Sequence, residues 1–126
     1  MDRMNESRAQ MVKERRVAPR FYLLSRADVT IPGRGDTYWG SLANISRTGL
    51  ALIIRQRLQP NSMVMIRLRF HADEGMEVTE TLAAKVVWHC GDNAGVQFEA
   101  PLFPGSPESR KTPHLVAHLI RKESGG

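Results

Sequence analysis

Residues 63–70, MVMIRLRF, decide the fold because apolar and polar side chains alternate along them. Every second position is apolar and is expected to face a core: Val64, Ile66, Leu68 and Phe70. The positions between them include Arg67 and Arg69, which are expected to face water. A period of two is the pattern of a β-strand with one buried face. These residues therefore predict a strand in a sheet that covers a core on one side.

Further stretches with strand character lie on both sides of this strand. Turn signals separate them: PGRGD at 32–36, ADEG at 72–75 and GDNA at 91–94. The additional strands are expected at residues 22–31, 37–46, 49–55, 77–90 and 95–99. Six strands at hairpin spacing, without helical segments between them, predict an all-β fold, namely a six-stranded antiparallel Greek-key barrel.

The long strand at 77–90 has a core face of its own. Its inward side chains are expected to be Leu82, Ala84, Val86 and Trp88, because side chains two apart point to the same face.

Two tails of different character flank the strands. Residues 1–13 are polar and mixed in charge, and they predict a flexible arm. The barrel domain is assigned to residues 14–100. Residues 101–126 are expected to form a linker, rich in proline, serine and glycine, and a short C-terminal helix.

The helix is expected at residues 114–122, HLVAHLIRK. Thr112 can cap its N-terminus, and Pro113 suits its first turn. An apolar stripe along it consists of Leu115, Val116, Leu119 and Ile120. This stripe is expected to pack on the barrel or on another subunit.

Length and composition narrow the class of protein. The 126 residues suit one domain, and 41% hydrophobic with 25% charged residues is ordinary for a globular protein. The net charge of +5 favours an anionic partner. A single cysteine excludes an internal disulfide framework and suits a reducing compartment. No apolar run is long enough to span a membrane, so a cytoplasmic location without membrane insertion is expected.

Catalytic and metal sites have little support. His89 and Cys90 are adjacent on a strand and would point to opposite faces, so a packed or edge thiol is favoured over a nucleophile. His114 and His118 have a spacing that can hold a metal, but no third ligand accompanies them. The chain is therefore expected to be no enzyme and to need no metal or cofactor.

Two polar stretches require another explanation. KERRVAPRF, at 13–21, gathers arginines, whose planar fork of donors suits phosphate or carboxylate; a solvated basic arm is the simpler interpretation. In ANISRTGLAL, at 43–52, Asn44 and Ser46 are expected on one strand face. Gly49 would supply a positive φ for the following bend. These residues can form a plain hairpin turn or a polar shelf that contacts a nucleotide base.

In this order, the two stretches resemble the signature of the PilZ domain family, RxxxR followed by (D/N)xSxxG. RxxxR falls on Arg16 and Arg20, and the second motif falls on Asn44, Ser46 and Gly49. The similarity continues through GLAL, VVW and GVQF and covers residues 14–99. Thr48 departs from the pattern, because many members have a second glycine there.

The resemblance implies a receptor for cyclic di-GMP, a bacterial second messenger, on a six-stranded barrel with an arginine-bearing arm. Arg16 and Arg20 would contact phosphate and guanine, and Asn44 and Ser46 the guanine edge, with Gly49 allowing close approach. Arg15, just before the motif, implies an intercalated pair of ligands. Arg47 and Trp88 are also expected to contact the ligand. For Trp88, a position in the core is an equally good interpretation. On binding, the arm would change conformation and signal to an effector protein.

Two other functions remain open at this point. A small basic barrel that binds nucleic acid would use exposed arginines such as Arg67 and Arg69, and its affinity would fall steeply with salt. A PilZ-like adaptor could instead bind only protein, although intact arginines argue against it. The effector is not identified by the sequence, and both a monomer and a homodimer are compatible with it.

Overall fold

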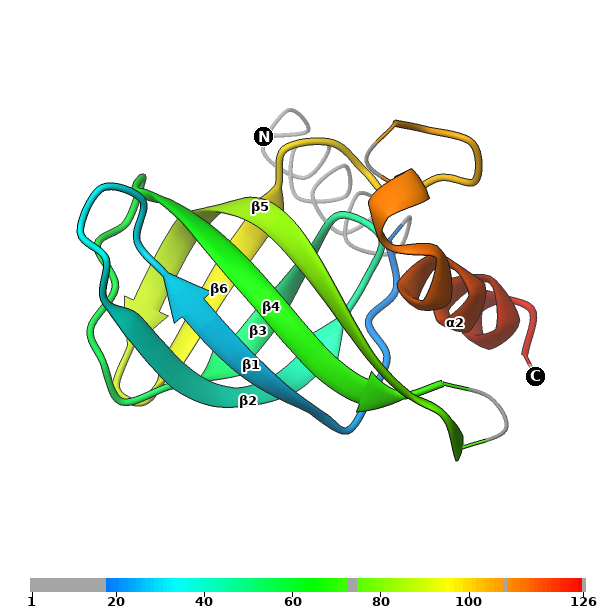
Figure 1. Ribbon diagram of the computed structural model, residues 1–126, viewed down its shortest axis with the longest axis horizontal. Helices are drawn as coiled ribbons and strands as arrows, with labels where there is room; N and C mark the ends of the chain where they lie inside the picture. Colours follow the sequence, from blue (N-terminus) through cyan, green and yellow to red (C-terminus); the bar gives the residue numbers. More distant parts are fainter. Residues whose placement is uncertain (1–17, 73–74, 108, 126) are drawn as a thin grey trace, which may run out of the picture.

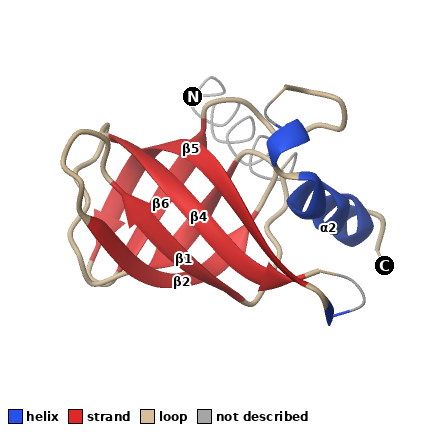
Figure 2. Cartoon of the chain, in the orientation of Figure 1, coloured by secondary structure: helices blue, strands red, loops and turns tan. Residues whose placement is uncertain are grey.

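The computed structural model describes residues 18–72, 75–107 and 109–125. Within these ranges the chain forms six strands followed by one α-helix (Figures 1 and 2). The strands are β1 (Ser25–Thr30), β2 (Thr37–Ile45), β3 (Gly49–Ile53), β4 (Met63–His71), β5 (Glu77–Cys90) and β6 (Asn93–Phe98). The 3-10 helix η2 (Ser109–Lys111) precedes the α-helix α2 (Pro113–Glu123). The predicted arm, Arg15 and Arg16 lie outside the described residues.

The six strands close into a barrel in the order β1, β2, β3, β6, β5, β4, and all neighbours are antiparallel (Figure 1). Because β4 lies beside β1 and not beside β3, the connection at 54–62 crosses an end of the barrel. Leu58 in that connection is 1% exposed, so it covers the core there. The predicted six-stranded antiparallel barrel is confirmed.

The core is made by the inward side chains of all six strands. In β4 the predicted alternation is confirmed at every position: Val64, Ile66, Leu68 and Phe70 are buried, whereas Arg67 and Arg69 are exposed. Burying an aliphatic or aromatic side chain of this size contributes roughly 1.5–3 kcal/mol. The alternation of β4 therefore fixes its register against β1 and β5.

The first predicted strand was too long at its N-terminal end. Residues 22–31 have strand-forming side chains, but β1 begins at Ser25, opposite Phe70 at the end of β4. Tyr22 and Leu24 precede it and are 66% and 75% exposed. The β-propensity of these residues does not extend the strand, because a strand also needs a neighbouring strand to pair with its backbone groups.

The C-terminal helix packs on the barrel, as one of the two predicted alternatives required. α2 lies at one end of the barrel, outside the strands (Figure 1). Leu115, Val116 and Leu119 are buried in the same core as the strand residues, whereas Ile120 is 43% exposed. The apolar stripe is thus narrower than predicted. No helix within the described ranges is long and apolar enough to cross a membrane.

The N-terminus of α2 is capped from the barrel. Thr112 occupies the N-cap position, but its side chain makes no capping hydrogen bond, so that prediction was wrong. The carboxylate of Glu80, in β5, accepts hydrogen bonds from the backbone N–H groups of His114 and Leu115, both at 2.9 Å. His114 Nδ1 also lies 2.9 Å from Glu80 Oε2. A carboxylate suits this place because a helix N-terminus presents unpaired N–H groups and a partial positive charge.

Candidate functional site

In the described residues before β1, an isolated backbone bridge fixes the chain to the end of β2. Phe21 N–H donates to Ile45 O, and Ile45 N–H donates to Phe21 O, both at 2.8 Å. Phe21 also packs against the core. The bridge places the preceding residue, Arg20, beside β2: its Nη1 donates to Oδ1 of Asn44 at 2.7 Å. Members of the two predicted motifs, 24 residues apart, are thus in direct contact.

Ser46 closes the turn between β2 and β3. Its side chain is 1% exposed, and its Oγ accepts hydrogen bonds from the N–H groups of Thr48 (3.2 Å) and Gly49 (3.3 Å). Ser46 N–H donates to Gly49 O at 2.8 Å. β2 ends at Ile45, so Asn44 and Ser46 do not continue on one strand face as the sequence predicted. The structure gives Ser46 the role of a turn former, and its contact with a ligand stays a prediction.

This role gives a testable consequence for Ser46→Ala. The free energy of unfolding should fall by roughly 1 kcal/mol, because the buried N–H of Gly49 and the partly buried N–H of Thr48 lose their acceptor. Urea denaturation followed by tryptophan fluorescence measures the change. Thr81→Ala, at an exposed position of β5, is the control and should leave stability within about 0.5 kcal/mol of wild type. An unchanged midpoint for Ser46→Ala would contradict the turn-forming role.

Gly49 is required for a reason other than the predicted one. Its φ is not among the positive values, so it does not supply a left-handed bend. A Cβ at Gly49 would instead collide with the backbone carbonyl oxygen of Val96 in β6. Glycine is the residue that permits such a close approach of two backbones within a sheet. The loop of the second motif is therefore held directly against β6.

Trp88 points away from the core, which corrects the predicted inward position. The pairing of β5 with β6 shifts register between Val86 and Trp88, so that Val86 opposes Val96 while Trp88 opposes Gly95. Such a β-bulge reverses the alternation of the residues that follow it. Trp88 is 41% exposed, and its indole occupies the space that a Cβ on Gly95 would need.

These features border one shallow depression, which we call the Arg20 pocket. It has a volume of about 190 Å³. Its lining residues come from the segment before β1, the turn of the second motif, β5 and β6: Arg20, Thr48, Gly49, Val87, Trp88, Gly95, Val96 and Gln97. The pocket combines a guanidinium group, which can bind phosphate, with an indole, on which a base can stack.

Comparisons with known proteins assign the chain to a family. The family model described as the PilZ domain matches residues 14–106. The chain belongs to the PilZ domain family. PilZ domains are generally receptors or adaptors for cyclic di-GMP. No curated protein sequence matches the chain.

Two solved structures share the fold of this PilZ domain. One is the PilZ domain of CeSA from a cellulose synthesizing bacterium, with a TM-score of 0.58 and 15% identity, covering 81% of this chain and 98% of that one. The other is the inhibitor of motility MotI/DgrA of Bacillus subtilis, with a TM-score of 0.64 and 12% identity. That match covers 86% of this chain but 51% of MotI/DgrA. At such low identity, both likenesses concern the fold alone.

Arg47 of this PilZ domain faces the C-terminal segment and does not line the Arg20 pocket. Its guanidinium forms a two-pronged ion pair with Glu123 at the end of α2, with Nε 2.9 Å from Oε2. It also lies 4.7 Å from the ring centre of Phe103. The hydrogen bonds to Glu123 raise the pKa of Arg47, so its guanidinium stays charged. Arg47 thus connects the second motif to α2.

Freeing Arg47 tests whether it can reach a ligand. Glu123→Gln should raise the affinity for cyclic di-GMP by up to about fivefold, because a partly exposed ion pair of this kind is worth at most about 1 kcal/mol. Calorimetric titration measures the affinity, and Glu99→Gln, an exposed carboxylate after β6, is the control. Unchanged affinity in Glu123→Gln would mean that Arg47 holds α2 and does not contact the ligand.

Two of the histidines considered for catalysis or metal binding, His89 and His114, have structural partners. His89 Nδ1 accepts a hydrogen bond from Leu58 N–H at 3.2 Å, and the neighbouring Cys90 is exposed. His114 is bound to Glu80. Among the described residues, no group of three or more His, Cys, Asp or Glu side chains could hold a metal ion.

Sequence reasoning missed Glu80, although a signal was present. Glu80 is in phase with the inward residues Leu82, Ala84 and Val86, and it is 5% exposed. A carboxylate at a core position of a strand needs a buried hydrogen-bonding partner. That partner is the N-terminus of α2. The sequence predicted this helix but did not show that its N-terminus lies against β5.

Proposed function

We propose that this PilZ domain binds cyclic di-GMP at the Arg20 pocket and signals to a partner protein. The observation that carries the proposal is the contact between Arg20 and Asn44 next to the exposed indole of Trp88. A guanidinium can bind a phosphate, or the O6 and N7 atoms of guanine, through paired hydrogen bonds. The amide of Asn44 can both donate to and accept from a guanine edge. Trp88 offers an aromatic surface on which a base can stack.

The size of the pocket supports participation of the arm. About 190 Å³ is less than the roughly 300–1,000 Å³ typical of small-molecule sites, so the ligand would lie largely on the surface. Residues before Ala18, including Arg15 and Arg16, would then cover it. Ordering them costs roughly 1–2 kcal/mol per residue, which charge-assisted hydrogen bonds of roughly 1.5–3 kcal/mol each can offset. The ordered arm would be the surface that a partner protein recognises.

Calorimetric and thermal titrations with cyclic di-GMP test this function. Cyclic di-GMP should raise the melting temperature, whereas GMP at equal concentration should not, because stabilisation by mass action requires specific affinity for the folded state. If Arg15 supports an intercalated pair, saturation should occur at about two ligands per chain. Equal shifts with both nucleotides would reveal a general anion site and contradict the proposal. Saturation at one ligand per chain would exclude the intercalated pair but not the proposed binding of cyclic di-GMP.

A further inference from the structure

Among the residues that the structure describes, a part of β2 has an edge without a strand partner. β1 pairs with β2 from Thr37 to Ser41, but β3 pairs with β2 only from Ser41 onward. Within the described part of the chain, the other edge of residues 37–40 therefore has no paired strand. Backbone groups alternate between the two edges of a strand, so every second residue directs its N–H and C=O toward this opening.

The opening exists because the segment that follows β3 turns away from β2. Ile54 N–H donates to Asp92 O at 2.8 Å, in the turn between β5 and β6, and Leu58 N–H donates to the ring of His89. Gly40 marks the point where the two strands meet, since a Cβ there would collide with Ile53 O. Beyond Gly40 the strands diverge, toward the end of the barrel away from α2 (Figure 1).

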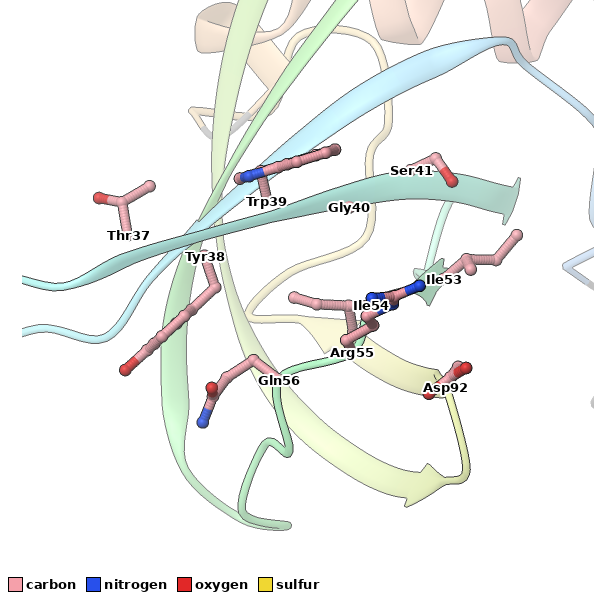
Figure 3. Close-up of a pocket in the computed structure, with 10 residues that line it drawn as sticks. All are labelled: Thr37, Tyr38, Trp39, Gly40, Ser41, Ile53, Ile54, Arg55, Gln56 and Asp92. Carbon is pink, nitrogen blue, oxygen red and sulfur yellow. The ribbon is translucent and has the colours of Figure 1, made fainter.

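A groove of about 850 Å³ lies between the two diverging segments (Figure 3). Tyr38 and Trp39 of β2 line one side, and Ile53, Arg55 and Gln56 line the other. Trp39 is 70% exposed and Ile53 is 48% exposed, so both offer uncovered apolar surface. None of the residues that line the groove also lines the Arg20 pocket. An open strand edge beside apolar side chains is suited to adding one more strand.

The charge around the groove favours an acidic occupant. Arg55 lines it, and the guanidinium of Arg26 lies 5.2 Å from the ring centre of Trp39. Exposed Arg34 and Arg57 lie in the two segments that border it. The carboxylates are fewer: Asp92, which also lines the groove, exposed Asp36, and Asp28, which is nearly buried between Arg26 and Arg67. Arginine forms strong, directional hydrogen bonds to carboxylates.

We infer that residues 37–40 of β2 receive an extended, acidic segment of a partner protein by β-strand addition. Backbone hydrogen bonds to the open edge hold the segment. Its apolar side chains contact Trp39 and Ile53, and its carboxylates contact Arg55 and Arg26. The site is separate from the Arg20 pocket and does not depend on cyclic di-GMP.

Selection from a displayed library of short random peptides tests this inference on the full chain. Enriched peptides should alternate apolar with acidic residues and contain no proline within the binding stretch. A selected peptide should slow hydrogen exchange at backbone amides of residues 37–40 and should lose binding when alternate peptide nitrogens are methylated. No enrichment, enrichment of basic peptides, or protection confined to other strands would each overturn the inference.

Two charge reversals give a matched comparison. Arg55→Glu should weaken the selected acidic peptide at least about tenfold, whereas Arg69→Glu, exposed on β4, should not. Both variants should keep the wild-type melting temperature. Equal affinity in wild type and Arg55→Glu would overturn the acidic assignment. Concentration-dependent self-association that Trp39→Ala abolishes would assign the edge to a second copy of the chain, which also overturns the inference.

Discussion

Arg20→Ala is expected to lower the affinity for cyclic di-GMP by about 100-fold or more, with little change in the melting temperature of the free protein. Arg20 is exposed, and its hydrogen bond to Asn44 at 2.7 Å positions the guanidinium at the edge of the pocket. Two charge-assisted hydrogen bonds to the ligand, at roughly 1.5–3 kcal/mol each, account for an effect of this size. Exposed substitutions usually change stability by less than about 0.5 kcal/mol.

Calorimetry and thermal melting of the same samples distinguish the possible causes. Arg69→Ala removes an equally exposed arginine from β4 and should retain affinity within about twofold, which controls for general electrostatic attraction. Arg20→Lys keeps the charge but not the planar fork, so it should recover only part of the loss. Wild-type affinity in Arg20→Ala would contradict the proposed site. Unfolding of that variant would show instead that Arg20 is a structural residue.

Gly49→Ala is expected to lower the free energy of unfolding by about 1–3 kcal/mol, which is more than we expect for Gly95→Ala. The added Cβ would collide with the backbone carbonyl oxygen of Val96 and lie 3.3 Å from the Cα of Gln97. Neither is the mobile end of a side chain, so β3 and β6 must separate where Gly49 pairs with Gln97. Chemical denaturation measures the loss.

Gly95→Ala provides a matched glycine substitution in the same pair of strands. Its Cβ would collide with the indole of Trp88, which is 41% exposed and can move outward. We therefore expect a smaller loss of stability, a changed tryptophan emission and weaker binding of cyclic di-GMP. If Gly49→Ala is as stable as wild type, or if Gly95→Ala is the less stable of the two, the structural explanation for Gly49 is wrong.

The sequence predicted those features that depend on neighbours along the chain. The alternation in β4 is strict, so every residue of it that was given a face was assigned correctly. Trp88 was misplaced because the bulge after Val86 arises from the pairing of β5 with β6, which the alternation of β5 alone does not reveal. The first strand was predicted too long because the end of β4 determines where pairing stops.

The candidate site was predictable only as a set of residue types. The motif resemblance selected Arg20 and Asn44, but their contact depends on the bridge between Phe21 and Ile45, which forms only when the barrel closes. The positive φ expected at Gly49 was wrong because the requirement comes from β6, a strand more than forty residues later in the chain. Local turn statistics contain no information about that approach.

The carboxylate of Glu80 has a consequence for where the folding unit ends. The family match stops at residue 106, yet the backbone donors that satisfy this buried carboxylate belong to His114 and Leu115. A fragment cut at residue 106 would keep the charge at a core position and remove its partners, which is among the costlier defects in a small protein. In turn, an eleven-residue helix is only marginally stable in water by itself. Barrel and helix are therefore parts of one cooperative unit, and a minimal fragment must extend through the end of α2.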